Sequence, residues 1–267
     1  MTQNRQIKRG TAKVRHGTIS YNLRATQGPL ILCIHGIGSS GLIFDPIFEQ
    51  QLLSQFTILT FDMLGHGSSS SSEADDYTVE SHAGSSSELL EVLELTYLPV
   101  TLICHSAGGA VGLALAKLLL NRLTGFINLE GNLIGEDCGL ATRWTSTMSF
   151  TDFLERGRNT LAEKIASQGE DTSYFMATDP KAFYKMAHSV VSWSDSGHLL
   201  STFLFELSCS RLYVYGEKNW DMPILSRLAP VPAVAIPCSG HVMMVDNPNI
   251  FYQTIGQFIR ENPAIHA

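Results

Sequence analysis

The sequence predicts an α/β fold: a mostly parallel β-sheet flanked by helices, with a helical cap inserted late in the chain. Short apolar runs bounded by glycine or aspartate indicate strands that are buried on both faces. Helix-length segments separate these runs, and this alternation is typical of a parallel sheet covered by helices. Because residues 133–207 show helical patterns and no clean buried strand, we expect them to form the cap, and residues 1–132 and 208–267 to form the core.

The expected elements follow in chain order. Residues 11–25 alternate between polar and apolar around His16-Gly17, which predicts a β-hairpin. Apolar runs predict six further strands, at residues 29–34, 56–61, 99–104, 125–129, 211–215 and 231–236. Helical spacing and capping signals predict core helices at residues 79–98 and 110–120 and after Asn247-Pro248, and cap helices at residues 136–148, 151–168 and 180–193.

Composition limits the classes of partner. A chain of 267 residues with 44% hydrophobic and 16% charged residues can bury one large core, or one core and a small lobe. The formal charge is −7, and the Lys and Arg residues form no stripe, which argues against nucleic acid as a partner. A small apolar or acyl molecule is the expected partner.

Cysteine usage and the chain start indicate a cytoplasmic protein. The five cysteines are widely spaced and include no C-x-x-C pair, so neither a disulfide framework nor a metal site is expected. Residues 1–17 are polar and basic, without the apolar segment of a signal peptide. The longest apolar stretch, residues 111–120, is interrupted by Lys117 and is too short for a membrane span.

Ser106 is the first candidate for a reactive residue. It lies between an expected strand and the helix at residues 110–120, and small residues, Ala107 and Gly108, follow it. A serine at such a tight turn presents its hydroxyl above the sheet edge, close to the free backbone N–H groups at a helix start. The pattern G-x-S-x-G is only partly met because Cys104 occupies the position of its first glycine.

Five motifs together resemble the alpha/beta-hydrolase fold family over nearly the whole chain. In order, they are His35-Gly36, the run from Asp62 to Ser69, the turn at Ser106, Tyr215-Gly216-Glu217 and Ser239-Gly240-His241. The resemblance implies a serine hydrolase with no cofactor, in which an acyl-enzyme forms on Ser106. It also implies that the backbone N–H groups of Ile37 and Ala107 form the oxyanion hole.

His241 is the expected general base. It follows Gly240 on the loop after the last apolar run, and the order serine, acid, histidine is the one that this fold uses. His35, His66 and His105 are expected on the same rim, as hydrogen-bonding loop residues or as pocket lining.

The acid of the triad is harder to assign. The resemblance implies an acid at the position of Asn219, but an amide cannot accept the charge. Two carboxylates could replace it: Asp221, two residues later, and Glu130, which ends an earlier strand. In several branches of the family, the haloalkane dehalogenases among them, the acid follows that earlier strand. We favour Glu130 as the triad acid. We expect Asp221 to be a helix cap ahead of Pro223.

The expected function is hydrolysis of a carboxylic ester or thioester, and other functions remain as alternatives. C–C bond hydrolysis and acyl transfer are alternatives on the same fold, and a ligand-binding protein without catalysis is a third. Residues 36–41 also fit G-x-G-x-x-G, with Asp62 suitably placed for a nicotinamide dinucleotide. Pro46 argues against this oxidoreductase alternative because it would fall inside the dinucleotide-binding helix, whereas the hydrolase interpretation needs no helix there.

The expected cap is the part of the sequence that indicates the class of substrate. Large apolar residues are expected to roof a pocket there and to pack the cap itself: Trp144, Met148, Phe150, Phe153, Phe175, Met176, Phe183, Tyr184, Met186 and Trp193. This composition favours an acyl or aromatic substrate.

Overall fold

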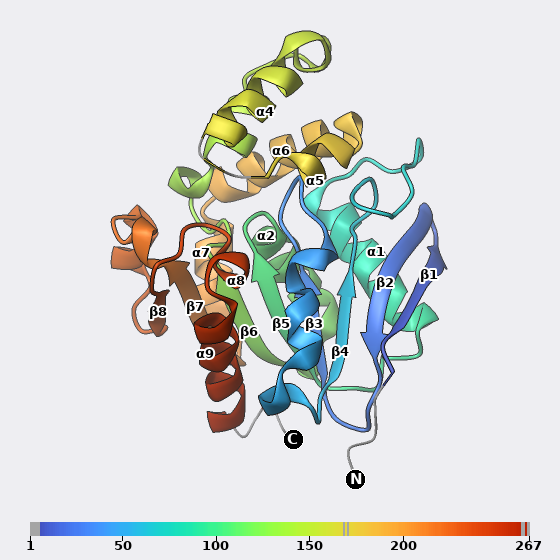
Figure 1. The fold of residues 1–267 in the computed structure, drawn as a ribbon, viewed down its shortest axis with the longest axis vertical. Coiled ribbons are helices and arrows are strands. Elements are labelled where there is room, and N and C mark those ends of the chain that lie inside the picture. The colour runs from blue at the N-terminus through green and yellow to red at the C-terminus, as the bar shows by residue number, and fades with distance from the viewer. Residues whose placement is uncertain (1–5, 168, 170, 263–264, 266–267) are drawn as a thin grey trace.

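The computed structural model describes residues 6–167, 169, 171–262 and 265 and places them around one eight-stranded sheet (Figure 1). The strand order is β1-β2-β4-β3-β5-β6-β7-β8. The first two pairings, β1 with β2 and β2 with β4, are antiparallel, and all later pairings are parallel. The expected fold class, an α/β core with a mostly parallel sheet and an inserted helical cap, is confirmed.

The bounds of the elements are as follows. The strands are β1 Lys8–Val14, β2 Gly17–Arg24, β3 Leu30–Ile34, β4 Thr57–Phe61, β5 Val100–His105, β6 Leu123–Leu129, β7 Ser210–Gly216 and β8 Ala233–Ile236. The α-helices are α1 Val79–Val92, α2 Gly108–Leu119, α3 Phe150–Asp152, α4 Arg158–Ser167, α5 Ser173–Ala177, α6 Pro180–Asp195, α7 His198–Ser201, α8 Met243–Asp246 and α9 Pro248–Glu261. Shorter 3-10 and π-helical turns join several of them.

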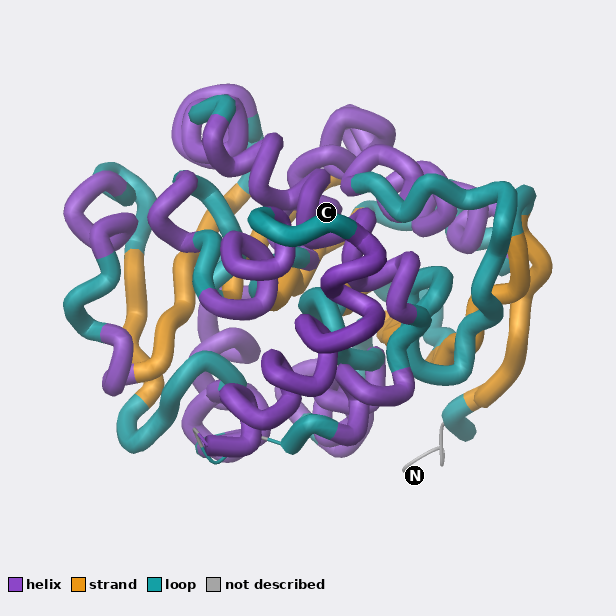
Figure 2. The backbone as a smooth tube through the Cα atoms, turned by 90° about the horizontal axis from the view of Figure 1, so that it is seen from above, coloured by secondary structure: helices purple, strands orange, loops and turns teal. Residues whose placement is uncertain are grey.

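Helices cover both faces of the sheet, as the view from above shows (Figure 2). Within the described residues, one apolar cluster packs α1 and α2 on one face. A second packs α9 and a 3-10 helix, η1 (Gly41–Glu49), on the other. The strands between these layers, such as β3 and β4, have every residue buried, which explains their continuous apolar sequence. In the described part of the chain, no helix combines the length and apolarity needed to cross a membrane.

Two expected helices differ from the structure. The helix expected over residues 79–98 ends at Val92, because Glu94 adopts a left-handed conformation with φ 57° and Leu95 N–H donates to Leu90 at 2.8 Å. The helix expected over residues 136–148 is present only in part. That segment is a 3-10 turn followed by a π-helical turn, and the extended backbone of Gly139, with ψ −149°, separates the two.

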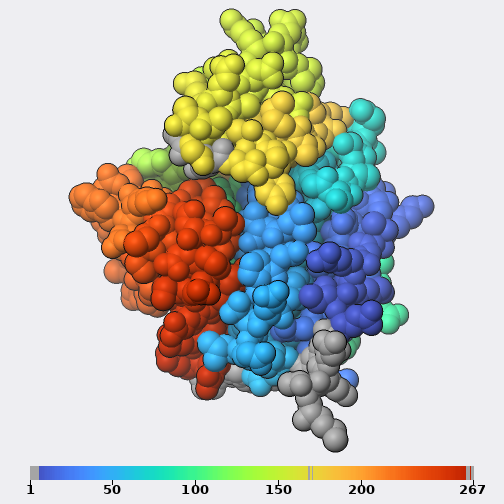
Figure 3. Space-filling view, viewed as in Figure 1, coloured from blue at the N-terminus to red at the C-terminus, as the bar shows by residue number. Residues whose placement is uncertain are grey.

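The insertion between β6 and β7 has two parts. Helices α6 and α7 pack into the main core through residues such as Met186, Val190 and Leu199. Residues near α4 and α5 instead form a small apolar cluster of their own, and they project above the rest of the molecule (Figure 3). We call this projecting part, residues 140–177, the distal lobe.

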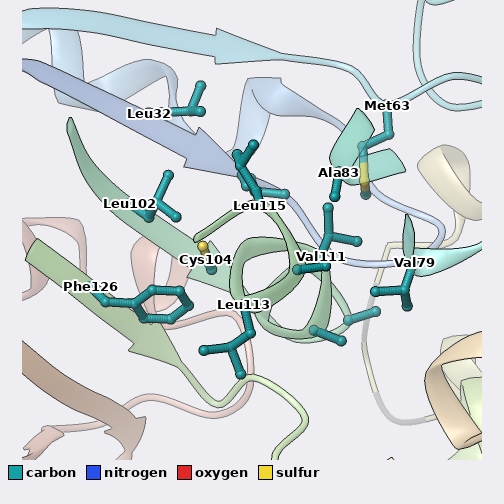
Figure 4. Packing of buried hydrophobic residues seen from close by; sticks show 14 of the residues in the cluster. Leu32, Met63, Val79, Ala83, Leu102, Cys104, Val111, Leu113, Leu115 and Phe126 are labelled. Carbon is teal, nitrogen blue, oxygen red and sulfur yellow. The ribbon is translucent and has the colours of Figure 1, made fainter. Parts of the chain in front are cut away.

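The core also shows how Cys104 is accommodated at the first position of the serine turn. Figure 4 shows Cys104 on β5 between helix α2 and the ring of Phe126 on β6. Gly112 of α2 faces this sulfur, and a Cβ on Gly112 would overlap Cys104 Sγ and lie 3.2 Å from the Phe126 ring. The cysteine therefore fills space that the helical glycine leaves open.

We predict that Gly112→Ala destabilises the fold by about 1 to 3 kcal/mol, because the new methyl overpacks this contact and outweighs the gain in helix propensity. In a Cys104→Ala background, the same change should cost less than about 1 kcal/mol. Urea unfolding of the four proteins of this cycle measures the coupling. Equal costs in the two backgrounds would show that the sulfur does not limit the space at Gly112.

Candidate active site

The carboxyl ends of five parallel strands bring the candidate residues to one edge of the sheet. In spatial order, the loops follow β3, β5, β6, β7 and β8, and they carry Ile37, Ser106, Glu130, Asn219 and His241 respectively. Ligands of open α/β sheets bind at this edge. The insertion lies above the same edge (Figure 1).

Ser106 occupies a strained turn between β5 and α2. Its φ of 53° lies in the left-handed region, which is uncommon for a residue with a side chain. Three hydrogen bonds fix this turn: Ser106 N–H donates to Leu129 at 3.0 Å, and its carbonyl accepts from Gly109 at 2.8 Å and from Asn132 at 3.3 Å. Gly36 lies so close that a Cβ there would be 2.9 Å from the Ser106 Cβ.

His241 lies beside this turn on the loop after β8. The His105 Nε2–H donates to the His241 carbonyl at 2.9 Å, and the two rings are 4.7 Å apart. Asp246 accepts the Gly240 N–H at 2.8 Å, which fixes the loop from its other end. The His241 side chain is 39% exposed, so its ring is open to a reactant.

Glu130 faces His241 from the end of β6. Its Oε2 lies 2.7 Å from His241 Nδ1, and its side chain is only 2% exposed. The Gly216 N–H donates to Oε1 at 2.8 Å, and the Asn219 amide donates to both carboxylate oxygens at 2.9 Å. The residue has a φ of 43°, which turns the chain away from the strand directly after Leu129.

The alternative acid, Asp221, lies apart from this arrangement. It is exposed, and the carboxylate that pairs with His241 Nδ1 is that of Glu130. The expectation that it caps the helix before Pro223 is wrong: the short 3-10 turn there begins with Met222 at its N-cap and has no side-chain cap. Met222 stands between Asp221 and Pro223, so Asp221 lies one residue before the N-cap.

The two expected oxyanion donors lie on either side of Ser106. Ala107 follows it directly, and Ile37 follows Gly36, which touches the serine turn. Across the described residues, the N–H groups of Ile37 and Ala107 are not used in backbone hydrogen bonds. Both are therefore available to an oxygen held above the turn.

Comparison with known proteins identifies the family. The profile described as "Alpha/beta hydrolase family" matches residues 31–254. The chain belongs to the alpha/beta hydrolase family.

Curated relatives match only over part of their length. An uncharacterized protein of Mycobacterium tuberculosis is 33% identical over 122 residues, which is 46% of this chain and 35% of that protein. Protein phosphatase methylesterase 1 of Gibberella zeae is 38% identical over 101 residues, which is 34% of this chain and 25% of the relative. The matches thus span between a quarter and 35% of the length of these two relatives.

Solved structures resemble the hydrolase over nearly the whole chain. A variant of the N-acyl homoserine lactonase AidH, complexed with N-hexanoyl homoserine, gives a TM-score of 0.76 at 21% identity and covers 96% of this chain and 98% of its own. A thermophilic esterase from Thermogutta terrifontis gives 0.74 at 21% identity, with 98% of this chain and 100% of its own covered. At these identities, the likeness establishes the fold.

The glycine motif of this hydrolase is used internally. Contrary to the sequence expectation, a helix does run through Pro46: η1, Gly41–Glu49, is a 3-10 helix with Pro46 inside it. The Asp62 carboxylate accepts the Gly41 N–H at 2.7 Å through Oδ1 and the Ser68 N–H at 2.8 Å through Oδ2. Because both oxygens are engaged, the arrangement weighs against a dinucleotide site.

The distal lobe and the first turn of α6 pack above the loop that carries Ile37. Phe175 and Phe183 line the space above Gly38, where an added Cβ would lie 3.4 and 3.0 Å from their rings. Phe153 stacks on Phe183 with centroids 5.7 Å apart, and Ile37 packs against the same cluster. Other residues expected to form the roof lie elsewhere: Met186 and Trp193 pack with the main core, and Phe150 and Met176 are exposed.

Four buried histidines surround the base of the site. The ring of His35 donates through Nδ1 to the Gly36 carbonyl at 2.7 Å and accepts the Met63 N–H at 3.0 Å, so both nitrogens of the neutral ring are used. Burial lowers the pKa of His35 to about 4 and that of His105 to about 3. Burial also lowers the pKa of His66 and of His82 to about 3; the nearby His35 adds to the effect at His66, and His66 adds to it at His82.

We predict that the free energy of unfolding falls as the pH decreases from about 6.5 to about 4. The unfolded chain protonates its histidines near pH 6.5, whereas the folded chain resists protonation of His35 and His105 until about pH 4 and 3. The contribution of these histidines to the free energy of unfolding is therefore fully present above the unfolded pKa. Below that pKa the contribution falls, and at pH 5 it is smaller by about 2 kcal/mol per histidine.

Urea unfolding at pH 7, 6 and 5 measures this dependence. His82→Gln is the matched variant, because His82 is buried on α1, and neither of its ring nitrogens has a hydrogen-bond partner in the described part of the chain. The free energy of unfolding of this variant should change less between pH 7 and pH 5 than that of the parent. A parent profile without slope between pH 7 and 5 would contradict the prediction.

Proposed function

We propose that this protein hydrolyses a carboxylic ester through an acyl-enzyme on Ser106, with His241 as general base and Glu130 as the triad acid. The observation that carries the proposal is the 2.7 Å contact between His241 Nδ1 and the buried Glu130 carboxylate, next to a serine in a strained strand-to-helix turn. A serine becomes nucleophilic when an adjacent base takes its proton, and the acid fixes the tautomer of that base.

In the proposed reaction, Ser106 Oγ attacks the ester carbonyl as His241 Nε2 takes the hydroxyl proton. The carbonyl oxygen, now negative, accepts hydrogen bonds from the Ile37 and Ala107 N–H groups. Glu130 stabilises the imidazolium, which then protonates the departing alcohol and leaves an acylated serine. Water, deprotonated by His241, attacks this ester, and the acid departs as the serine recovers its proton.

The choice of an ester is supported by the chemistry named for similar proteins. A lactonase, an esterase and a phosphatase methylesterase are among them, and each name denotes cleavage of a carbonyl–oxygen bond. The apolar cluster above Ile37 favours an apolar acyl group. We further propose that residues 133–207 act as the cap that selects it. A thioester is the second candidate, because the same acyl-enzyme would form.

We predict that a fluorophosphonate probe labels Ser106, because the hydroxyl beside His241 is the one that the site activates. Peptide mapping by mass spectrometry identifies the labelled serine, and hydrolysis of p-nitrophenyl esters of graded acyl length, next to acyl thioesters, ranks the substrates. Ser106→Ala should abolish both labelling and turnover. Labelling of the Ser106→Ala protein at the parent rate would remove the nucleophile assignment.

We predict that Glu130→Gln lowers kcat by about 10⁴, because the loss of a triad acid leaves the histidine in the wrong tautomer. Asp221→Asn is the matched control: it removes the exposed carboxylate that was the alternative acid and should leave kcat within about twofold. Thermal melts verify that both variants fold. A folded Asp221→Asn variant with crippled kcat, beside near-normal Glu130→Gln, would reverse the assignment.

A further inference from the structure

Asn219 makes an unusual double contact with the Glu130 carboxylate. Its Nδ2 lies 2.9 Å from both Oε1 and Oε2, and the Gly216 N–H donates to Oε1 at 2.8 Å. Oε1 thus accepts from Gly216 and Asn219, while Oε2 accepts from Asn219 and faces His241. The buried carboxylate is surrounded by donors, as a charge removed from water requires.

The short turn that carries Asn219 is fastened to the loop that carries His241. Helix η8, Glu217–Asn219, follows β7 directly, and its Lys218 N–H donates to Ser239 at 3.0 Å. In the other direction, Glu217 accepts the Cys238 N–H at 2.9 Å. These two bonds join the η8 turn to the loop that carries His241. The backbone of Asn219 is therefore held rigidly next to the Glu130 carboxylate.

The amide is the side chain that this geometry requires. An aspartate at position 219 would place a second carboxylate against both oxygens of Glu130, and two like charges so close oppose ionisation of one of them. An apolar residue would leave the buried charge with fewer donors. The amide supplies hydrogen atoms and no charge.

We propose that Asn219 is a positioning residue, whose amide holds the Glu130 carboxylate in the orientation that presents Oε2 to His241 Nδ1. The inference rests on the proposed function of the site and extends it. Because Asn219 acts through Glu130, its removal should weaken catalysis only while the carboxylate is present.

The test is a double-mutant cycle of Asn219→Leu and Glu130→Gln. Leucine keeps the size of asparagine and removes the donor. Asn219→Leu should lower kcat by about 10- to 100-fold and change KM less than threefold, since outer partners of a reactive group act at this scale. In the Glu130→Gln background, the same change should alter kcat less than threefold. Asp221→Asn serves as the control from the neighbouring turn.

A second readout needs no substrate. In protein labelled with ¹⁵N-histidine, the Nδ1 proton of His241 is assigned by its loss in His241→Gln. In Asn219→Leu this signal should exchange faster with water than in the parent. If Asn219→Leu does not fold, Asn219→Ala takes its place in both experiments.

The outcomes separate the two proposals. Failure of the parent to turn over any ester or thioester, with an altered His241 proton in Asn219→Leu, would remove the proposed function and keep the positioning role. Unchanged kcat and an unchanged His241 proton in Asn219→Leu, with Glu130→Gln inactive, would overturn the role of Asn219. Equal losses in both backgrounds would also overturn it, because Asn219 would then act independently of Glu130.

Discussion

The site depends on how closely five loops approach one another at the carboxyl edge of the sheet. Glycines stand where the backbones touch: Gly36 against the serine turn, Gly109 against Gly131, and Gly216 against the backbone of Gly240. A side chain at any of these positions would overlap a neighbouring loop. Each reactive group is therefore carried on backbone that is packed against the next loop, and no loop can move far alone.

Burial gives the ionisable side chains at this edge of the sheet different charge states. The histidines below the serine turn are kept neutral by desolvation, and His35 and His105 use that neutral state to hold backbone groups. His241 differs because its ring is partly exposed and has a carboxylate partner. The contact with the buried Glu130 carboxylate thus sets the imidazole of His241 apart from the buried histidines nearby.

The sequence was most informative where one physical signal dominates. Fully buried strands appear as continuous apolar runs, so the core strands were found within a few residues, and the last helix begins at Pro248 as its capping signal predicted. The hydrogen bonds between Asn219 and Glu130 could not be predicted from the sequence, because they depend on two neighbouring parallel strands. Knowing that β6 and β7 are adjacent would have paired the two residues. Segments 41–49 and 136–148 were misjudged because 3-10 and π-helical turns have no distinct periodicity.

The divided attachment of the insertion has an evolutionary consequence. Helix α6 is tied to the core near its start, where Asp179 N–H donates to Gly65 at 2.8 Å and Lys181 pairs with Glu73 at 3.1 Å. The distal lobe instead packs on itself, on the loop with Ile37 and on α6 residues such as Phe183. The buried apolar residues of the lobe belong to a different cluster from the two that cover the sheet, so we expect inherited substitutions within these fewer than forty residues to change the surface above Ile37 with little effect on the sheet.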